Sequence, residues 1–246
     1  MRREMGTRTF YDESLPPWNC PSCGIGRLEI AKSRRKANKG ALLSITAVDA
    51  NTTAMQKEFG NYPYPEGVFA TILGCNRGEC EEHVAISGTW WMLETMVNGE
   101  QDMQYVHYVE HVTPALHFFN IPAKCPKKII PELVSAFSLY WCDPKSCLNR
   151  IRATIELLLT RMKVPPKPRL HDRILELGKS KPELADHLMA VKWLGNAGSH
   201  TSPASDDDAL DGFEILEHVL KESFDPINRL STSINRRKGP IRRKKK

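Results

Sequence analysis

The chain has 246 residues, 41% of them hydrophobic and 26% charged, which is enough for one large domain or two ordinary ones with separate cores. No stretch approaches the roughly eighteen uninterrupted apolar residues of a membrane span, and the first twenty residues lack the apolar core of a signal peptide. This composition excludes a membrane-spanning class and predicts a soluble, cytoplasmic protein with no membrane partner.

The net charge of +6 is distributed unevenly. Residues 229–246 contain nine basic residues and no acidic one, so residues 1–228 hold 26 basic against 29 acidic side chains. The body of the protein is weakly acidic and the basic element is its tail. Such a run has little to bury and is expected to be disordered when free.

The first half is predicted to be β-structure. Between residues 27 and 119, short runs rich in β-branched and aromatic residues alternate with Gly, Asn and Pro. His107 and His111 are expected on one face of a strand, as a solvated or cross-strand pair. Residues 119–128 contain two prolines and are typical of a connector, which places the first domain at 1–120.

After Ile130 the apolar period changes from two to about 3.6, which indicates helices. Pro131 and Glu132 can open the first helix, and Asp143 followed by Pro144 fits the start of the second. The apolar stripe of this second helix is Ile151, Ile155, Leu158, Leu159 and Met162.

Three further helices follow. A short one is predicted around 170–177, and a capping box from Ser180 to Glu183 is predicted to start the next, which Gly195 should end or bend. Ser205, with three aspartates after it, is expected to cap the last helix. The fold class is therefore α+β, with a metal-bound β module at 1–120, a bundle of about five helices at 121–228 and a basic tail at 229–246.

Four cysteines predict a metal site in the β module. Cys20 and Cys23 have the C-x2-C-G shape of a zinc knuckle, and Cys75 with Cys80 forms a second, wider pair. Two knuckles joined by strands are how zinc ribbons are built, so we expect one structural zinc ion. His83 is a possible substitute ligand, and ordinary buried cysteines are the alternative.

The other cysteines are given no metal role. If Asp143 caps a helix, Cys142 and Cys147 occupy the two positions that pack together in a hydrophobic staple. Cys125 has no partner that the sequence identifies.

The segment from Lys192 to His200 reads KWLGNAGSH and is the densest polar, glycine-containing motif of the helical half. Asn196 and His200 lie four residues apart and share a face if the backbone there is helical. A histidine near an amide and a cation suits acid–base work on a phosphodiester, with Lys192, Asn196 and His200 as candidate catalytic residues. The alternative is that they cap helix ends in a tight turn.

The helical half resembles the domain-of-unknown-function family 4145, which is similar to the HEPN superfamily of nucleotide- and RNA-binding helical domains. The likeness rests on Ile121-Pro, on Ile130-Pro-Glu-Leu, on the helix from Arg150 to Glu156, on KWLGNAGSH and on the Asp-rich start of the last helix. It implies a HEPN-like bundle that forms a homodimer, a cysteine-rich ribbon upstream, and an accessory or effector role in prokaryotic defence.

Ribonucleolytic HEPN domains resemble one another in an Arg-x(4–6)-His motif that cleaves RNA without metal. Here the arginine position holds Gly195, which leaves the ribonuclease activity open. Lys192 lies one turn earlier but lacks the planar fork of arginine. Arg152 and Glu156 are candidates to complete a polar site, or are an ordinary pair on one helix.

The tail is expected to bind the phosphate backbone of RNA or DNA without reading its sequence. The alternatives are a solubilising or protein-binding tail and, for the whole chain, a protein-interaction scaffold. The expected nucleic-acid contacts are Arg236, Arg237, Lys238, Arg242, Arg243, Lys244, Lys245 and Lys246.

Overall fold

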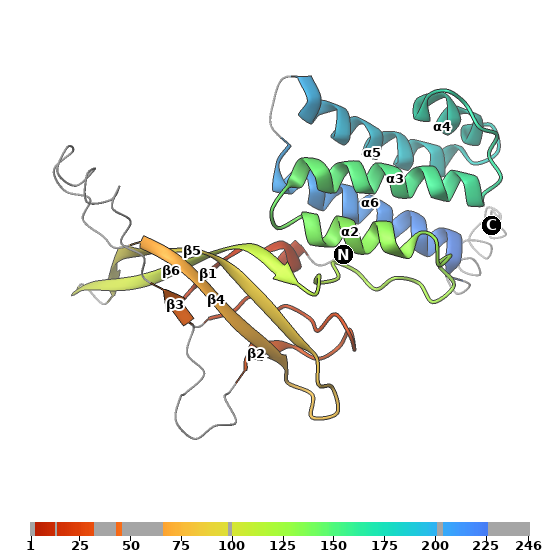
Figure 1. Ribbon diagram of the computed structural model, residues 1–246. Coiled ribbons are helices and arrows are strands. Elements are labelled where there is room, and N and C mark those ends of the chain that lie inside the picture. Colours follow the sequence, from red (N-terminus) through yellow and green to blue (C-terminus); the bar gives the residue numbers. More distant parts are fainter. Residues whose placement is uncertain are drawn as a thin grey trace, which may run out of the picture. The chain divides into compact units, whose positions relative to one another are not determined.

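The computed structural model describes residues 3–12, 14–31, 43–45, 66–97, 100–200 and 204–225, without the side chains of 43–45, 97 and 195–200. Within these residues the α+β class is confirmed, because an antiparallel sheet precedes five helices (Figure 1). The chain divides into two compact units: residues 2–118 with 137–147, and residues 119–136 with 148–246. No helix in the described part of the chain is long and apolar enough to cross a bilayer.

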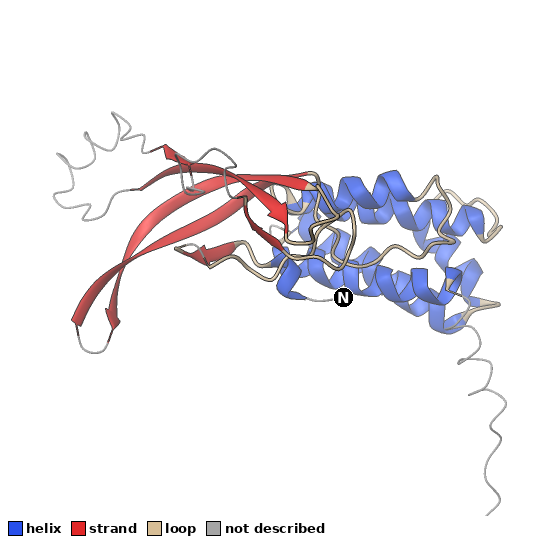
Figure 2. Cartoon of the chain, turned by 90° about the horizontal axis from the view of Figure 1, so that it is seen from below, coloured by secondary structure: helices blue, strands red, loops and turns tan. Residues whose placement is uncertain are grey.

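A short 3-10 turn, η1 (Arg3–Gly6), precedes a sheet whose described strands are all antiparallel and bend into a half-barrel (Figure 2). Its order is β1-β6-β5-β4-β2, and β3 also pairs with β4. The strands are β1 (Thr9–Tyr11), β2 (Leu28–Ile30), β3 (Leu43–Ile45), β4 (Glu66–Cys75), β5 (His83–Val97) and β6 (Glu100–Thr113).

The core of the sheet unit is rich in aromatic rings. Phe10 stacks on His107 with ring centroids 4.7 Å apart, and it meets the edge of Phe69 at 5.9 Å. Trp18 is fully buried and lies edge-on to Trp141, which belongs to the 137–147 segment of the same unit. A segment distant in sequence therefore completes this core.

Arg8 links the 137–147 segment to the sheet through hydrogen bonds. Its guanidinium donates hydrogen bonds to the backbone carbonyl oxygens of Tyr140 and Trp141, the latter at 2.9 Å, and lies over the Tyr140 ring. The arginine is 8% exposed, so its charge is stabilised by these carbonyls and by the aromatic ring rather than by water.

The prediction that His107 and His111 share a face is wrong. A bulge shifts the β5–β6 register, so that Ser87 pairs with His111 but Gly88 pairs with Val109. The extra residue reverses the alternation of faces. His107 is consequently buried, which lowers its pKa, whereas His111 is exposed.

The five predicted helices are present, and they are α2 (Ile130–Leu139), α3 (Pro144–Arg161), α4 (Leu170–Gly178), α5 (Pro182–His200) and α6 (Asp206–Phe224). Two predicted caps are confirmed. Asp143 accepts the Ser146 N–H at 2.9 Å, and Ser205 forms a capping box with Asp208.

Two local predictions are wrong, and a third, that Gly195 ends or bends α5, is wrong as to the end of the helix. Ser180 does not cap α5, because its hydroxyl donates to the Leu177 carbonyl and the helix begins at Pro182. Gly195 does not end α5, which runs to His200. Cys147 is buried but Cys142 is exposed, so they do not form a buried staple.

Candidate metal centre

The first pair of cysteines lies on a tight turn between residues 18 and 28. The Cys20 N–H donates to the Gly26 carbonyl at 2.7 Å, and the Gly24 N–H donates to the Cys20 carbonyl at 2.9 Å. Gly24 has a φ of 71°, a left-handed conformation that glycine adopts without the steric cost of a Cβ. The C-x2-C-G spacing thus turns the backbone so that both thiols point the same way.

The second pair lies where β4 turns into β5. Cys75 is the last residue of β4, and its N–H donates to the Glu82 carbonyl at 3.1 Å. The Cys80 N–H donates to the Arg77 carbonyl at 3.0 Å, which closes a smaller turn inside this loop.

Strand pairing brings the two turns together. Leu28 of β2 pairs with Cys75 of β4. Just beyond that pair, the Asn76 N–H donates to the Arg27 carbonyl at 2.9 Å, and the Arg27 N–H donates to Asn76 Oδ1 at 3.0 Å. The sheet therefore supplies the geometry that the widely separated cysteines need.

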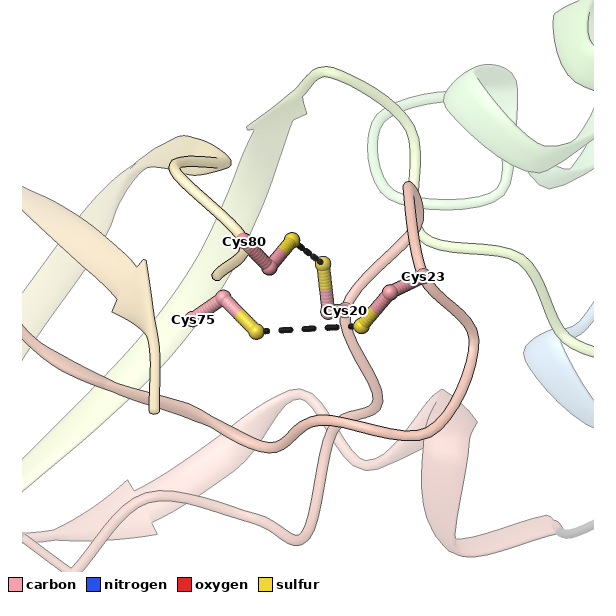
Figure 3. Close-up of side chains that lie close together, drawn as sticks. All are labelled: Cys20, Cys23, Cys75 and Cys80. Carbon is pink, nitrogen blue, oxygen red and sulfur yellow. Dashed lines mark hydrogen bonds between the residues drawn. The ribbon is translucent and has the colours of Figure 1, made fainter. Parts of the chain in front are cut away.

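All four sulfur atoms lie within 4.8 Å of one another (Figure 3). The Sγ atoms of Cys20 and Cys80 are 3.7 Å apart, and those of Cys23 and Cys75 are 3.8 Å apart. A tetrahedral ion bound at about 2.3 Å by four thiolates separates its sulfurs by about 3.8 Å. The four cysteines predicted from spacing therefore form a cluster with metal-site dimensions.

The environment of the thiols differs from one side of the cluster to the other. Backbone N–H groups of Ile25 and Gly26 stabilise the Cys23 thiolate and lower its pKa to about 6. Burial raises the pKa of Cys20 to about 12, and it also raises the pKa of Cys75. Cys23 is thus ready to bind a cation at neutral pH, and a bound cation would have to displace protons from Cys20 and Cys75.

Gly26 is a residue of this site that the sequence reasoning missed. A Cβ at this position would lie 2.4 Å from the Cys75 sulfur and 3.2 Å from the Cys23 sulfur. Glycine is therefore required for the sulfurs to approach so closely. The only signal in the sequence is its place three residues after Cys23.

His83 does not join the cluster. Its ring is exposed, and Nδ1 lies 2.8 Å from the Glu81 carbonyl oxygen. Within the described residues, Cys20, Cys23, Cys75 and Cys80 are the one group of three or more potential ligands at metal-binding distances.

The structure describes the other predicted site only in part. Lys192 lies on α5 with its Nζ 4.0 Å from the centre of the exposed Trp193 ring. The side chains of Asn196 and His200 lie outside the described residues, although α5 is helical through both positions. The predicted nucleic-acid contacts at 236–246 also lie outside them.

Arg152 and Glu156 form an exposed pair on α3, with Nε and Oε1 3.9 Å apart. An exposed pair of this kind adds little to stability. None of the described contacts joins the Arg152–Glu156 pair to the 192–200 segment. The suggestion that this pair completes a polar site there stays a prediction.

Family comparisons match the two halves of the chain separately. Residues 134–239 match the family described as Domain of unknown function (DUF4145). This confirms the predicted likeness of the helical half. Residues 8–119, which span all four clustered cysteines, match Domain of unknown function (DUF8608). No curated protein and no solved structure matches the chain.

Proposed function

We propose that this chain is a cytoplasmic, nucleic-acid-associated protein, in which a zinc-ribbon-like β module is joined to a HEPN-like helical bundle and the basic tail binds phosphate. The observation that carries the proposal is the separation of charge: nine basic residues and no acid at 229–246, after a body of 26 basic and 29 acidic residues. A weakly acidic body repels a phosphate backbone, so the tail supplies the attraction.

Zinc is the ion that best suits the cysteine cluster. Four thiolates with sulfur separations of 3.7 and 3.8 Å match a tetrahedral, sulfur-only site. Such a site has no open position for substrate, so the ion is structural. Purified protein is expected to carry one zinc per chain by elemental analysis, and to lose thermal stability when a chelator removes it. Unchanged melting after complete zinc removal would contradict this role.

Nucleic-acid binding is tested by fluorescence anisotropy with labelled single-stranded RNA and duplex DNA at several salt concentrations. The full-length protein is compared with a full-length variant in which the eight basic residues of 236–246 are replaced by glutamine. Wild type is expected to bind both polymers, with an affinity that falls steeply as salt rises, and the variant to lose most of that binding. Equal binding by both proteins would overturn the proposed role of the tail.

A ribonuclease is the second candidate. It is favoured by the unbroken backbone of α5, which places Lys192, Asn196 and His200 at successive steps of four residues along one helix. RNA is incubated in chelator with wild type and with His200→Ala. Cleavage by wild type that the variant lacks would support catalysis by His200; equal cleavage, or none, would remove this candidate.

A protein-interaction scaffold with a homodimeric bundle is the third class. Co-purification of a stoichiometric protein partner, together with no salt-sensitive binding of RNA or DNA, would favour a scaffold over both other candidates. Sedimentation analysis of the purified chain tests the homodimer.

A further inference from the structure

Two histidine rings meet between α5 and α6, which pack against each other in the helical unit (Figure 1). The ring centroids of His187 on α5 and His218 on α6 lie 4.7 Å apart, and the ring planes are inclined at 75°. Neither ring belongs to the functions proposed above: the cysteine cluster lies in the other unit, and the candidate ribonuclease residues lie further along α5.

The separation of the rings matches that of two imidazoles bound to one ion. An imidazole nitrogen binds zinc at about 2.0–2.1 Å, which puts the ring centre about 3.2 Å from the ion. Two such rings at an angle of about 90–110° at the ion have centres about 4.5–5.2 Å apart, and the 4.7 Å between His187 and His218 falls in this range. An ordinary edge-to-face contact spans similar distances, so the groups around the pair decide between the two.

One nitrogen of this histidine pair lacks a partner. The His187 Nδ1 atom is buried, and it has no hydrogen-bond partner among the residues that the structure describes. An unpaired buried polar atom is uncommon in a folded protein and calls for an explanation such as a bound water or ion. The histidine of the neighbouring helix α4 differs, because His171 Nδ1 lies 3.2 Å from the Met189 sulfur. An ion held by His187 would supply the partner that its nitrogen lacks.

Carboxylates accompany both rings at helical spacing. Glu222 follows His218 by four residues, with its Oε2 4.0 Å from His218 Nε2. Glu183 precedes His187 by four residues, and residues four apart share a face of a helix. Both glutamates line one open cavity where α5 begins and α6 ends, so the two helices present them at the same end. Two imidazoles are therefore combined with two carboxylates.

The charge along α6 also favours a cation. His218 has an acidic residue on either side at helical spacing, because Glu214 precedes it by four positions as Glu222 follows it. Lys221, the basic residue of this helix, is paired with Glu217 at 2.6 Å. The basic side chains that line the cavity come from outside this helix pair, from the 119–128 connector, the end of α3 and the turn before α5.

These groups are gathered but do not yet surround an ion as closely as the four sulfurs do. No three of them lie within 4.8 Å of one another in the described part of the chain. Ligands bound to zinc at about 2.0–2.2 Å bring nitrogen and oxygen to about 3 Å from each other, so the 4.0 Å between His218 and Glu222 must shorten by about 1 Å. Their side chains are 61% and 35% exposed, which leaves both free to turn without disturbing the core.

We propose that His187, His218 and Glu222 bind one divalent transition-metal ion, with Glu183 adding negative charge beside it. Imidazole and carboxylate donors together suit zinc, cobalt(II) and nickel(II). Three protein ligands leave a tetrahedral ion one position for water, in contrast to the closed set of four cysteines. This second metal site is independent of the basic tail, of the cysteine cluster and of the candidate ribonuclease.

The test is a cobalt(II) titration of full-length protein prepared without a histidine tag, followed by calorimetry and absorbance. The cysteine cluster is first loaded with one equivalent of zinc, which cobalt(II) binds too weakly to displace. Two site variants, His218→Gln and Glu222→Gln, change exposed side chains, so the fold is expected to survive. Their matched controls in the same unit are His171→Gln and Glu156→Gln.

Wild type is expected to bind one cobalt(II) per zinc-loaded chain, without the sulfur-to-cobalt absorption that the cysteines would give. Each site variant should weaken this binding at least tenfold, and the controls should bind like wild type. No saturable binding, sulfur-to-cobalt absorption alone, or equal affinities in the site variants and the controls would overturn the proposal.

Thermal melting checks that the ion binds the folded helical unit. Cobalt(II) should raise the melting temperature of zinc-loaded wild type and of His171→Gln, because a ligand of the folded state stabilises that state. The same addition should leave His218→Gln unchanged. An equal rise in His218→Gln would place the ion elsewhere and would overturn the assignment to this histidine pair.

Discussion

Replacing Gly26 by alanine is the sharpest test of the metal centre. The added Cβ would lie 2.4 Å from the Cys75 sulfur, 3.1 Å from Arg77 Cγ and 3.2 Å from the Cys23 sulfur. Non-bonded heavy atoms prefer separations of about 3.5–4.0 Å, so the turn and the sulfur must move apart by about 1 Å. Metal–ligand distances tolerate changes of only about 0.2 Å.

The expected effect is on metal affinity. Displacing a group that supports the ligands typically costs ten- to a hundredfold in affinity, or about 1.4–2.8 kcal/mol. Affinity is measured by competition with a chromophoric chelator, and the thiolate ligand field by the absorbance of the cobalt-substituted protein. Gly26→Ala is expected to bind zinc at least tenfold more weakly than wild type.

Gly78→Ala is the matched control, because it adds the same methyl group in the loop between Cys75 and Cys80. A Cβ at Gly78 meets nothing within 4 Å, so its metal affinity should equal that of wild type. If Gly26→Ala also binds zinc like wild type, the close packing of the two turns does not control the site. If both variants lose affinity equally, the loss reflects loop rigidity and not contact with the sulfur.

Three further predictions follow from individual contacts. Gly88→Ala places a Cβ 1.9 Å from the Tyr108 carbonyl oxygen at the bulge and is expected to destabilise the sheet by at least about 2 kcal/mol in urea unfolding; an unchanged midpoint would contradict this. Asp143→Ala should cost about 1 kcal/mol at neutral pH. Hydrogen bonds from Ser146 lower the Asp143 pKa, so this difference should persist above the ordinary carboxyl pKa and vanish as pH falls through the lowered value; a cost independent of pH would refute it. Zinc affinity should fall on acidification, because burial raises the Cys20 pKa and the ion must displace that proton; affinity that is flat with pH would exclude thiolate ligands.

Local chemistry made much of this protein predictable from its sequence. Apolar spacing and caps such as Asp143 and Ser205 depend on residues within a few positions, so five helices could be placed in order. The C-x2-C-G turn is equally local, and it identified Cys20 and Cys23, two of the four cysteines that cluster. Some local signals failed: Ser180 bonds back into α4, α5 does not end at Gly195, and Cys142 is exposed and does not join Cys147 in a buried staple.

Tertiary structure decided the features that join distant segments. The bulge at Gly88, which separates the faces of His107 and His111, depends on the pairing of two long strands. The role of Gly26 depends on a sulfur 49 positions away along the chain. An open cavity in the helical unit brings together the ends of α3, α4 and α6 and the start of α5, although each of its lysines taken alone is typical of an ordinary surface residue. The sequence by itself determined the five helices, the β-structure between residues 27 and 119 and the cysteine set, because apolar periods, caps and the C-x2-C-G turn depend on residues close in the chain. Only folding determined β1, which lies outside that range, and which charges and sulfurs meet, because long-range contacts leave no periodic signal.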